Sequence, residues 1–482
     1  MKALKLTLIA TAVASLLSPL AAQATSEFDN FTPMTGNTTP VNPGSATPYK
    51  LSSPNFSQET ISDRGTQNTL VPGSYSGNPD MMTANETGVD AGRYLFMPFE
   101  TGSAGVVRID LQDTNYNTRT TTIVAPGTQD FVSGDASRWT PWGSYLTAEE
   151  SWGTGSTKGR LFEIDNATTA TANGGNFIQQ SIIPRVSHEG LAFDNNNNLY
   201  FVDELNGGSI YKYTSANPLA LNGSDFFSAG QTFALKVQAG GQFEGTSGAA
   251  ITGLATWEAI TNTTGGALAG ISTVLADGTI DGRVSADNAA VMATGFNRPE
   301  DLEIQDLGDG NQFLYFATTD SDNDAKGSNG SGRVYSFNLA SSEVKLFADS
   351  NTIDAATGLS VGGEFKSPDN LAIDAEGNMY IVEDQNGGVE DVWFAMDANR
   401  DGVADSVSKW ISLTTQGAES TGLYFDKFDT TKAYINVQHP ADGIDRTIML
   451  TAPAAVPVPG AVWLFGSALM GFLGFSRRNK KA

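Results

Sequence analysis

The sequence has no cysteine among its 482 residues and only two histidines. Without cysteine the chain can form no disulfide bond, and it offers no thiolate as a nucleophile or metal ligand. Segments with strong helical periodicity are also missing, which argues against an α/β enzyme. The fold must therefore gain its stability from a large core, from bound metal ions, or from both.

Basic residues are scarce as well, with 28 Lys and Arg against 53 Asp and Glu and a net charge of −25. The first 24 and the last 32 residues carry six of the basic residues and no acid. The segment between them therefore has 22 basic against 53 acidic residues, a charge of −31. Such a surface repels nucleic acids and anionic lipids, so neither is expected as a partner. Many carboxylates also suit hard cations such as calcium.

Residues 1–24 have the pattern of a secretory signal peptide. Lys2 and Lys5 precede an apolar run, and Ala22-Gln-Ala24 supplies the small residues of a cleavage site. The alternative, an uncleaved membrane anchor, fits the short apolar run less well, so we predict export.

Residues 25–89 are rich in Thr, Ser, Asn, Pro and Gly. They predict an irregular arm that lies outside the main domain or completes one of its sheets.

Residues 451–482 combine the segment Val456-Pro-Val-Pro-Gly460 with an apolar run and a basic end. The run 461–475 is short for a transmembrane helix, which needs about 20 apolar residues. A plain tail anchor is one interpretation, with the basic cluster on the cytoplasmic side. The order of features also resembles the PEP-CTERM sorting signal, although the glutamate of that motif is absent. This resemblance implies a single short membrane helix, an exosortase-type processing enzyme as partner, and a cell-surface protein that stays anchored or is released.

A hydrophobic strand that follows a Gly/Asn/Asp turn and ends in polar residues recurs along residues 90–450. The copies end at Glu100, Glu150, Glu204, Asp320, Asp384 and His439, and most are followed by a second short strand. Spacing of roughly 40 to 110 residues between copies suits β-propeller blades with loop insertions. We predict an all-β fold, a six-bladed β-propeller over residues 90–450, in which an insertion near 222–297 could hide a further blade.

A second set of polar residues stands just before the first strand of most copies, and includes His188-Glu189, Arg298-Pro-Glu300, Asp369 and Glu419. The innermost strand of each propeller blade lines the central channel, so these residues and the strand ends can converge on one channel mouth. For any single residue, a turn-forming role is the alternative. Both histidines and the acid pairs Glu149-Glu150 and Glu383-Asp384 follow the pattern, and adjacent acids repel unless a cation lies beside them.

The motif Thr140-Pro-Trp-Gly-Ser-Tyr-Leu-Thr-Ala-Glu-Glu150 resembles the signature Thr-Pro-Trp-Gly-Thr-Trp-Leu-Thr-Cys-Glu-Glu of PhoX-type alkaline phosphatases. Later motifs of that family are similar, in order, to His188-Glu189, residues 296–300, residues 369–371 with Glu383-Asp384, and residues 419–422 with 436–440. The resemblance spans about residues 90–445. It implies a six-bladed propeller that hydrolyses phosphate monoesters with calcium and iron at the channel mouth.

Carried over by position, the resemblance implies metal ligands at Glu149, Glu150, Glu189, Glu300 and at Glu383 or Asp384. It also implies catalytic roles for Arg298, which would hold a phosphate oxygen, and for Glu300. Ala148 stands where the family has an iron-ligating cysteine, and alanine cannot coordinate a metal. A site that holds calcium but lacks iron, with weaker or lost activity, is therefore expected.

The segment 397–405 fits the opening of an EF-hand loop. Asp397, Asn399, Asp401 and Asp405 occupy its positions 1, 3, 5 and 9, and Gly402 occupies the sixth, so the oxygens could surround one calcium ion. Ser408 stands at position twelve in place of a bidentate glutamate. The site would therefore need a ligand from elsewhere, and a polar turn is the alternative.

Three functional hypotheses follow. The first is an exported, calcium-dependent phosphomonoesterase that acts on a phosphate ester or another small molecule. The second is a lactonase-like calcium-propeller hydrolase, because such folds also gather Glu, Asn and Asp at the channel. The third is a non-catalytic, calcium-binding surface or matrix protein. A sorting tail specifies an address and not a chemistry, so it is compatible with all three.

Overall fold

The computed structural model describes residues 28–36, 47–150, 153, 155–308, 310–319, 332–384 and 390–453. The predicted signal peptide and nearly all of the predicted sorting segment lie outside these residues. Within the described part of the chain, no helix is both long and apolar enough to cross a membrane.

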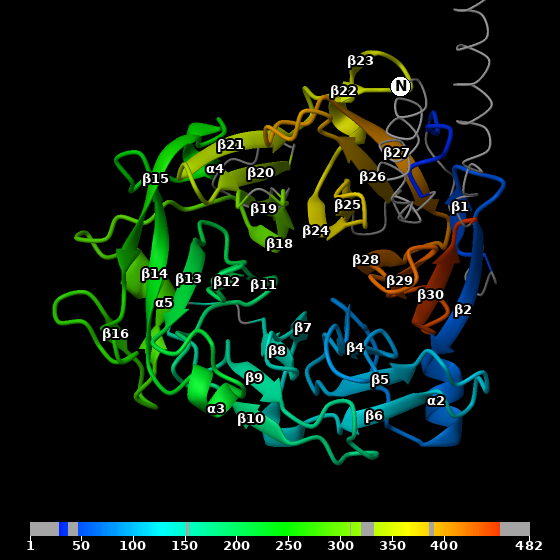
Figure 1. Cartoon of the computed structure of the whole chain (residues 1–482), viewed down its shortest axis with the longest axis horizontal. Helices are drawn as coiled ribbons and strands as arrows, with labels where there is room; N and C mark the ends of the chain where they lie inside the picture. Colours follow the sequence, from blue (N-terminus) through cyan, green and yellow to red (C-terminus); the bar gives the residue numbers. More distant parts are fainter. Residues whose placement is uncertain are drawn as a thin grey trace, which may run out of the picture.

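Antiparallel four-stranded units surround a central axis, and each unit runs outwards from an innermost strand (Figure 1). Three units are separate sheets. They are β3 (Thr83–Ala84), β4 (Tyr94–Pro98), β5 (Val106–Asp110) and β6 (Thr120–Val124); β7 (Gly134–Trp139), β8 (Tyr145–Glu149), β9 (Leu161–Ile164) and β10 (Phe177–Gln179); and β28 (Glu419–Phe425), β29 (Lys432–Gln438), β30 (Arg446–Thr451) and β2 (Ser57–Asp63).

The other units belong to two larger sheets. The nine-stranded sheet contains β11 (Leu191–Phe193), β12 (Leu199–Val202), β13 (Ile210–Ser215) and β14 (Gly230–Val237), then β15 (Gly253–Ala259), then β21 (Glu343–Ala348), β20 (Arg333–Asn338), β19 (Gln312–Thr318) and β18 (Pro299–Asp306). The seven-stranded sheet contains β24 (Pro368–Ile373), β25 (Met379–Glu383), β26 (Asp391–Met396) and β27 (Ser406–Leu413). Both β22 (Ile353–Asp354) and β1 (Tyr49–Leu51) pair with β27, and β23 (Leu359–Ser360) pairs with β22.

The insertion near 222–297 adds no further four-stranded unit among the residues described there. It forms part of β14, the bridging strand β15, the hairpin β16 (Thr273–Val274) and β17 (Ile280–Asp281), and the short helices α3 (Gly223–Phe226), α4 (Glu244–Ser247) and α5 (Gly282–Ala286). Because β15 pairs with both β14 and β21, the insertion connects two neighbouring units.

A repeated turn sets the register of the innermost hairpins. The carboxylate of Asp194 accepts hydrogen bonds from the backbone N–H of Asn196 and Asn198, at 2.9 and 2.8 Å, and from the Tyr200 hydroxyl at 3.1 Å. Residues 374–380 repeat the arrangement between β24 and β25. An aspartate that closes the turn on its own backbone favours a tight connection, and the tyrosine ties the turn to the second strand.

Aromatic side chains fill the spaces between neighbouring units. Between the β24–β27 and β28–β30 units, Trp410 packs on Tyr380 and Phe28 with ring centroids 4.8 and 5.8 Å apart, and all three are fully buried. Both faces of many strands are covered, as the complete burial pattern of β4, β8 and β25 shows. A large core of this kind supplies the stability that disulfide bonds cannot supply here.

The segment that was expected to be an irregular arm contributes regular structure. β2 (Ser57–Asp63) pairs with β30 and so joins the first part of the chain to the last sheet. β1 pairs with β27, β3 is the innermost strand of the first unit, and α2 (Arg64–Leu70) follows β2. The sheets therefore begin well before residue 90, and of the two expectations for this segment the pairing of β1, β2 and β3 fits the one in which it completes a sheet.

We predict that β2 contributes to global stability by joining the two ends of the propeller-like fold. Ile61 is buried among side chains of the first and last units, so Ile61→Ala should lower the free energy of unfolding by about 2–4 kcal/mol through the lost contacts and the cavity left behind. Urea denaturation measures this change. Leu219→Ala is the control, because Leu219 is 81% exposed, and a similar loss in both variants would contradict the role of β2.

Candidate metal centre

Each innermost strand carries an acid at its start, at one end of the central channel. We call these residues the strand-start acids. They are Asp80, Asp135, Glu189, Glu300, Asp369 and Glu419. All of them except Glu419 are buried. They come from segments that are far apart in the sequence.

A second repeated position follows the neighbouring strand of each unit. We call Glu100, Glu150, Glu204, Thr319 and Asp384 the strand-end residues. In every case the backbone N–H donates to the carbonyl of the residue two positions before the strand-start acid, at 2.8–3.0 Å. The acceptors are Asn78, Ser133, Ser187, Arg298 and Ser367. This bond holds the two sets at the same mouth of the channel.

The backbone bends sharply just before the strand-start acids. Asn78, Ser133, Arg298 and Ser367 have φ angles of 49°, 40°, 50° and 39°, which are uncommon for residues other than glycine. Such strain persists only where the surrounding structure enforces it, and it clusters at functional sites. The recurrence of the bend in several units indicates that it serves to direct the following acid.

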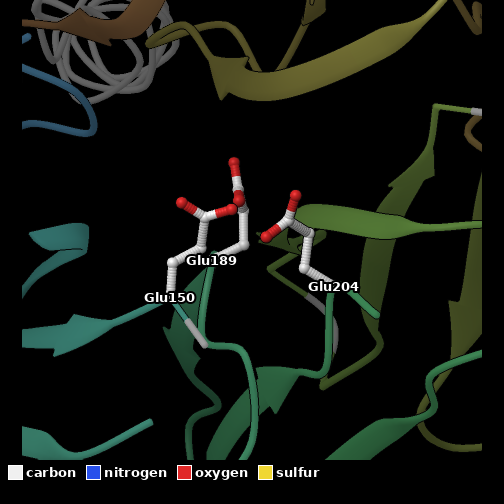
Figure 2. A group of neighbouring side chains, drawn as sticks. All are labelled: Glu150, Glu189 and Glu204. Carbon is white, nitrogen blue, oxygen red and sulfur yellow. The ribbon is translucent and has the colours of Figure 1, made fainter. Parts of the chain in front are cut away.

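Three groups of carboxylates lie close enough to share a metal ion. They are Glu150, Glu189 and Glu204; Glu189, Glu300 and Asp369; and Asp369, Asp384 and Glu419, with oxygens that lie within 4.8 Å of one another in each group. In Figure 2 the carboxylates of Glu150, Glu189 and Glu204 face a common space. Because Glu189 and Asp369 each belong to two groups, the acids form one continuous row.

Arg298 lies among these acids. Its guanidinium contacts carboxylate oxygens of Glu204 at 2.8 Å, of Glu300 at 3.1 Å and of Asp384 at 3.7 Å. It thereby connects all three carboxylate groups. One arginine cannot neutralise so many acids, so the row requires further positive charge in the form of protons or cations.

The N-terminal part of the chain also reaches the centre. Asp80 accepts a hydrogen bond from Gln438 at its carboxylate and one from Asn436 at its carbonyl, each at 2.7 Å. A side chain at Gly422 would place its Cβ 2.4 Å from that carbonyl, and Gly422 has φ of +61°. Only glycine allows this close approach, which brings the first unit against the last.

Burial disfavours the ionised form of these acids. It raises the pKa of Glu150 to about 7 and that of Glu100 to about 8, and neighbouring carboxylates add to both effects. Burial likewise raises the pKa of Glu189, Glu300 and Asp369 well above the usual range. Ionised carboxylates can gather at this density only with compensating positive charge.

The donor set fits a hard cation. Every member of the three groups offers carboxylate oxygen, which calcium prefers. Glu300 Oε2 and Asp135 Oδ1 are buried and have no hydrogen-bond donor in the described part of the chain. Buried oxygens of this kind are available to a metal ion, so calcium suits the arrangement.

Comparisons with known proteins decide the family. A family model described as alkaline phosphatase PhoX matches residues 136–441, more than half of the chain. The chain belongs to the PhoX alkaline phosphatase family. The structure of Pseudomonas fluorescens PhoX in complex with vanadate, a transition state analogue, shares the propeller-like fold, with a TM-score of 0.62 at 16% identity over 86% of this chain and 98% of that one.

Other similar structures are more distant. The PQQ-bound aldose sugar dehydrogenase from Streptomyces coelicolor covers 82% of this chain and 98% of its own, with a TM-score of 0.37 at 10% identity. A Bacteroides thetaiotaomicron protein of unknown function covers 82% of this chain and 76% of its own, with a TM-score of 0.38 at 14% identity. No curated protein matched the sequence.

The structure brings together most of the residues that the PhoX motifs indicated. Glu150, Glu189, Glu300, Asp384 and Arg298 all lie in the row. Of the two alternatives at 383 and 384, Asp384 belongs to a carboxylate group and Glu383 does not.

Glu149 and Glu383 are engaged elsewhere. Glu149 is buried against Arg160, whose guanidinium donates to both carboxylate oxygens at 2.5 and 2.7 Å. Glu383 accepts from the Trp393 indole at 2.8 Å and from the Lys366 backbone N–H at 2.7 Å. Strand alternation explains both cases, because adjacent residues point to opposite faces and only one acid of each pair can face the channel.

Site prediction from sequence missed several members of the row. Glu204, Asp369 and Glu419 belong to the carboxylate groups, and Asp80 and Asp135 are further strand-start acids. The signal for Glu204, Asp369 and Glu419 was present, since each stands at the repeated strand-start or strand-end position. The signal for Asp80 was hidden, because it lies in the segment expected to be irregular.

The two histidines lie near the row but outside its carboxylate groups. His188 is buried against the Phe201 ring, with ring centroids 5.2 Å apart, and burial lowers its pKa to about 3. His439 Nε2 lies 3.7 Å from a carboxylate oxygen of Glu419. Their position follows the repeat, and neither side chain replaces a carboxylate in it.

The predicted EF-hand-like loop closes on itself. Asp397 accepts from the backbone N–H of Asp401 at 3.2 Å and of Gly402 at 2.9 Å, and Asp405 accepts from that of Ala398 at 2.9 Å. Asn399 Oδ1 also accepts from Asp401 N–H, at 3.1 Å. These contacts form a polar turn between β26 and β27, and the calcium site at this loop stays a prediction.

Ala148 is the residue at which the resemblance to the PhoX signature implies a cysteine in that family. It is fully buried in β8 and packs in an apolar cluster with Leu146, Leu161 and Val186. Its methyl group offers no donor atom to a metal. A thiolate-ligated iron therefore does not fit this position.

We predict that the metal-free protein loses stability as the pH rises. Glu150 and Glu100 have pKa values near 7 and 8 when folded and ordinary values near 4.5 when unfolded, so the folded state binds more protons between these limits. Protein stripped of metal should melt at a lower temperature at pH 8 than at pH 5.5.

Added calcium should raise the melting temperature more at pH 8 than at pH 5.5, because it replaces the missing protons. Differential scanning calorimetry of stripped and calcium-loaded protein measures both effects. A metal-free melting temperature that rises between pH 5.5 and 8, or that calcium leaves unchanged at pH 8, would contradict the cation site.

Proposed function

We propose that this chain is an exported, calcium-dependent phosphomonoesterase built on a six-bladed β-propeller. The continuous row of carboxylates with Arg298 in its midst carries the proposal. Membership of the PhoX family supports the reaction class. The arrangement of the four-stranded units around one axis supports the number of blades.

The three carboxylate groups would hold the cations. Calcium bound there would neutralise charge on phosphoryl oxygens and activate an attacking oxygen. Glu189 and Asp369, which each belong to two groups, would hold neighbouring cations at a fixed separation. Since both side chains are buried, their orientation is set by packing before any substrate binds.

Arg298 would bind and orient the phosphate. Its planar guanidinium can donate two parallel hydrogen bonds to a phosphate, and three acids already fix its position. Those acids also keep the guanidinium charged, because they raise its pKa against the effect of burial. The chain thus presents a rigid anion-binding group within an otherwise negative centre.

We propose a calcium centre without thiolate-ligated iron, because Ala148 supplies no ligand. The same observation favours a second candidate function, in which a PhoX-type propeller binds calcium at the cell surface without catalysis. Turnover measurements separate these candidates. Export through residues 1–24 and attachment through a PEP-CTERM-like tail, processed by an exosortase-type enzyme, belong to both.

Phosphatase activity should depend on calcium and on Arg298. Wild-type protein should hydrolyse p-nitrophenyl phosphate with added calcium and lose this activity after chelation. Arg298→Lys keeps the charge but loses the planar fork, so kcat/KM should fall roughly 100-fold.

Arg93→Lys is the matched control for that substitution, because Arg93 forms an exposed pair with Asp110 at 2.8 Å, away from the row. It should leave kcat/KM within about twofold. If the calcium-loaded wild type binds calcium but shows no turnover of any phosphomonoester, the non-catalytic candidate is supported instead.

Restoring the thiol should restore iron binding. Ala148→Cys should increase the iron content and the turnover of the purified protein, because a thiolate adds a strong iron ligand. Elemental analysis together with kinetics measures both. Ala286→Cys is the control, because it adds a buried thiol to the same apolar cluster but on α5. It should change neither the iron content nor the turnover. Strong iron-dependent turnover of the wild type would show that another ligand replaces the cysteine.

A further inference from the structure

The unit β18–β21 departs from the repeated pattern at two positions. Four of the strand-end residues are acids, but Thr319 is neutral. In five units the backbone N–H of the strand-end residue donates to the carbonyl of the residue two positions before the strand-start acid. That acceptor residue is Asn or Ser in four of these units, but in this unit it is Arg298. At these two positions the unit has a hydroxyl where the others have an acid and a cation where the others have a small polar residue, and both side chains contact Glu300. Asp320, at which this copy ends in the sequence, lies outside the described residues.

Both substituted side chains contact the same oxygen of Glu300. The Thr319 hydroxyl donates to Glu300 Oε1, and Arg298 Nε lies 3.1 Å from that oxygen. Thr319 is only 3% exposed, and its backbone N–H is fixed on the Arg298 carbonyl at 3.0 Å. The Thr319 hydroxyl therefore has little rotational freedom. Its other acceptor is the Pro368 carbonyl at 3.3 Å.

The second oxygen of Glu300 has different surroundings. Oε2 is buried and has no hydrogen-bond donor among the described residues. An unpaired buried carboxylate oxygen is costly unless a cation or a proton satisfies it. Glu300 also belongs to the central group with Glu189 and Asp369.

We propose that Thr319 is a positioning residue for the metal centre. Its hydroxyl, together with Arg298, holds one oxygen of Glu300 so that the other stays directed at the cation shared with Glu189 and Asp369. This inference rests on the proposed cation site, and it extends that site to a residue that is not itself a ligand.

A hydroxyl suits this role better than the acid found in the other units. A carboxylate at position 319 would repel Glu300 and would add negative charge beside Arg298. Threonine donates a hydrogen bond without adding charge, and its β-branched side chain has few rotamers. The hydroxyl therefore orders Glu300 while leaving the positive charge of Arg298 for an anion.

Thr319→Val tests the hydroxyl alone, because valine keeps the branched shape and the backbone bond. Calcium titration of the full-length protein by isothermal calorimetry should show about tenfold weaker binding at the centre, as outer contacts of metal ligands typically contribute 10–100-fold. Thr319→Ser, which keeps the hydroxyl, should restore the affinity to within about threefold of the wild type.

Thr318→Val is the matched control. Thr318 is the preceding residue in the same strand and is fully buried, but its hydroxyl faces the Arg333 carbonyl at 3.4 Å. This variant should bind calcium like the wild type. If Thr319→Val does not fold, Thr319→Ala removes the same hydroxyl with less bulk, and the Ser variant remains the rescue.

The readouts separate this inference from the proposed function. Weaker calcium binding in Thr319→Val with rescue by Ser supports it even if no variant hydrolyses phosphate esters. Unchanged calcium affinity in a folded Thr319→Val overturns it even if the wild type is an active phosphatase. In an active enzyme, kcat of the Val variant should recover at high calcium while KM for substrate changes little. A loss of kcat that saturating calcium does not reverse would also count against the inference.

Discussion

Mutual repulsion among buried carboxylates is the constraint on which this structure depends. Two unit charges about 5 Å apart repel by about 3 kcal/mol at an effective dielectric constant of about 20, and the row contains three overlapping groups at such distances. Arg298 offsets part of this repulsion. The remainder requires protons or cations, so the stability of the fold and the occupancy of the site are linked.

A rigid scaffold is needed to hold like charges together. The recurring backbone hydrogen bond between strand-end and strand-start positions provides it, and the left-handed φ angles before the acids store strain that the sheets must support. Pairing of β2 with β30 joins the first part of the chain to the last sheet, so the acids of the first and last units cannot drift apart. Bulky aromatic packing between units then limits any opening of the channel mouth.

The residues around the site divide into an apolar part and a charged part. Ala148 belongs to an apolar cluster and supplies no ligand atom. The carboxylates and Arg298 remain together, and Thr319 adds a neutral donor beside them. The composition of this centre suits hard cations and anions, which it would hold through electrostatics. Positioning of this kind, rather than covalent chemistry, is what phosphoryl transfer needs from a protein.

The repeat in the sequence was sufficient to predict an all-β, propeller-like fold in which polar strand ends converge, and the resemblance to the PhoX motifs singled out Glu150, Glu189, Arg298 and Glu300 among them. Local pattern carried this information, because strand alternation and turn residues are properties of neighbouring positions. It also located the strand-start and strand-end positions of Asp369, Glu204 and Glu419, although their membership of the row was not recognised.

Only the tertiary structure decided which acid of each adjacent pair faces the channel. Glu149 and Glu383 carry carboxylates like their neighbours, but Arg160, just before β9, and Trp393, on β26, engage them. It also decided that the segment before residue 90 supplies β2 and Asp80, because pairing with β30 and contact with Gln438 join residues that are at least 358 positions apart in sequence. Such contacts arise from the closure of the sheets around one axis, and no local sequence pattern encodes that closure.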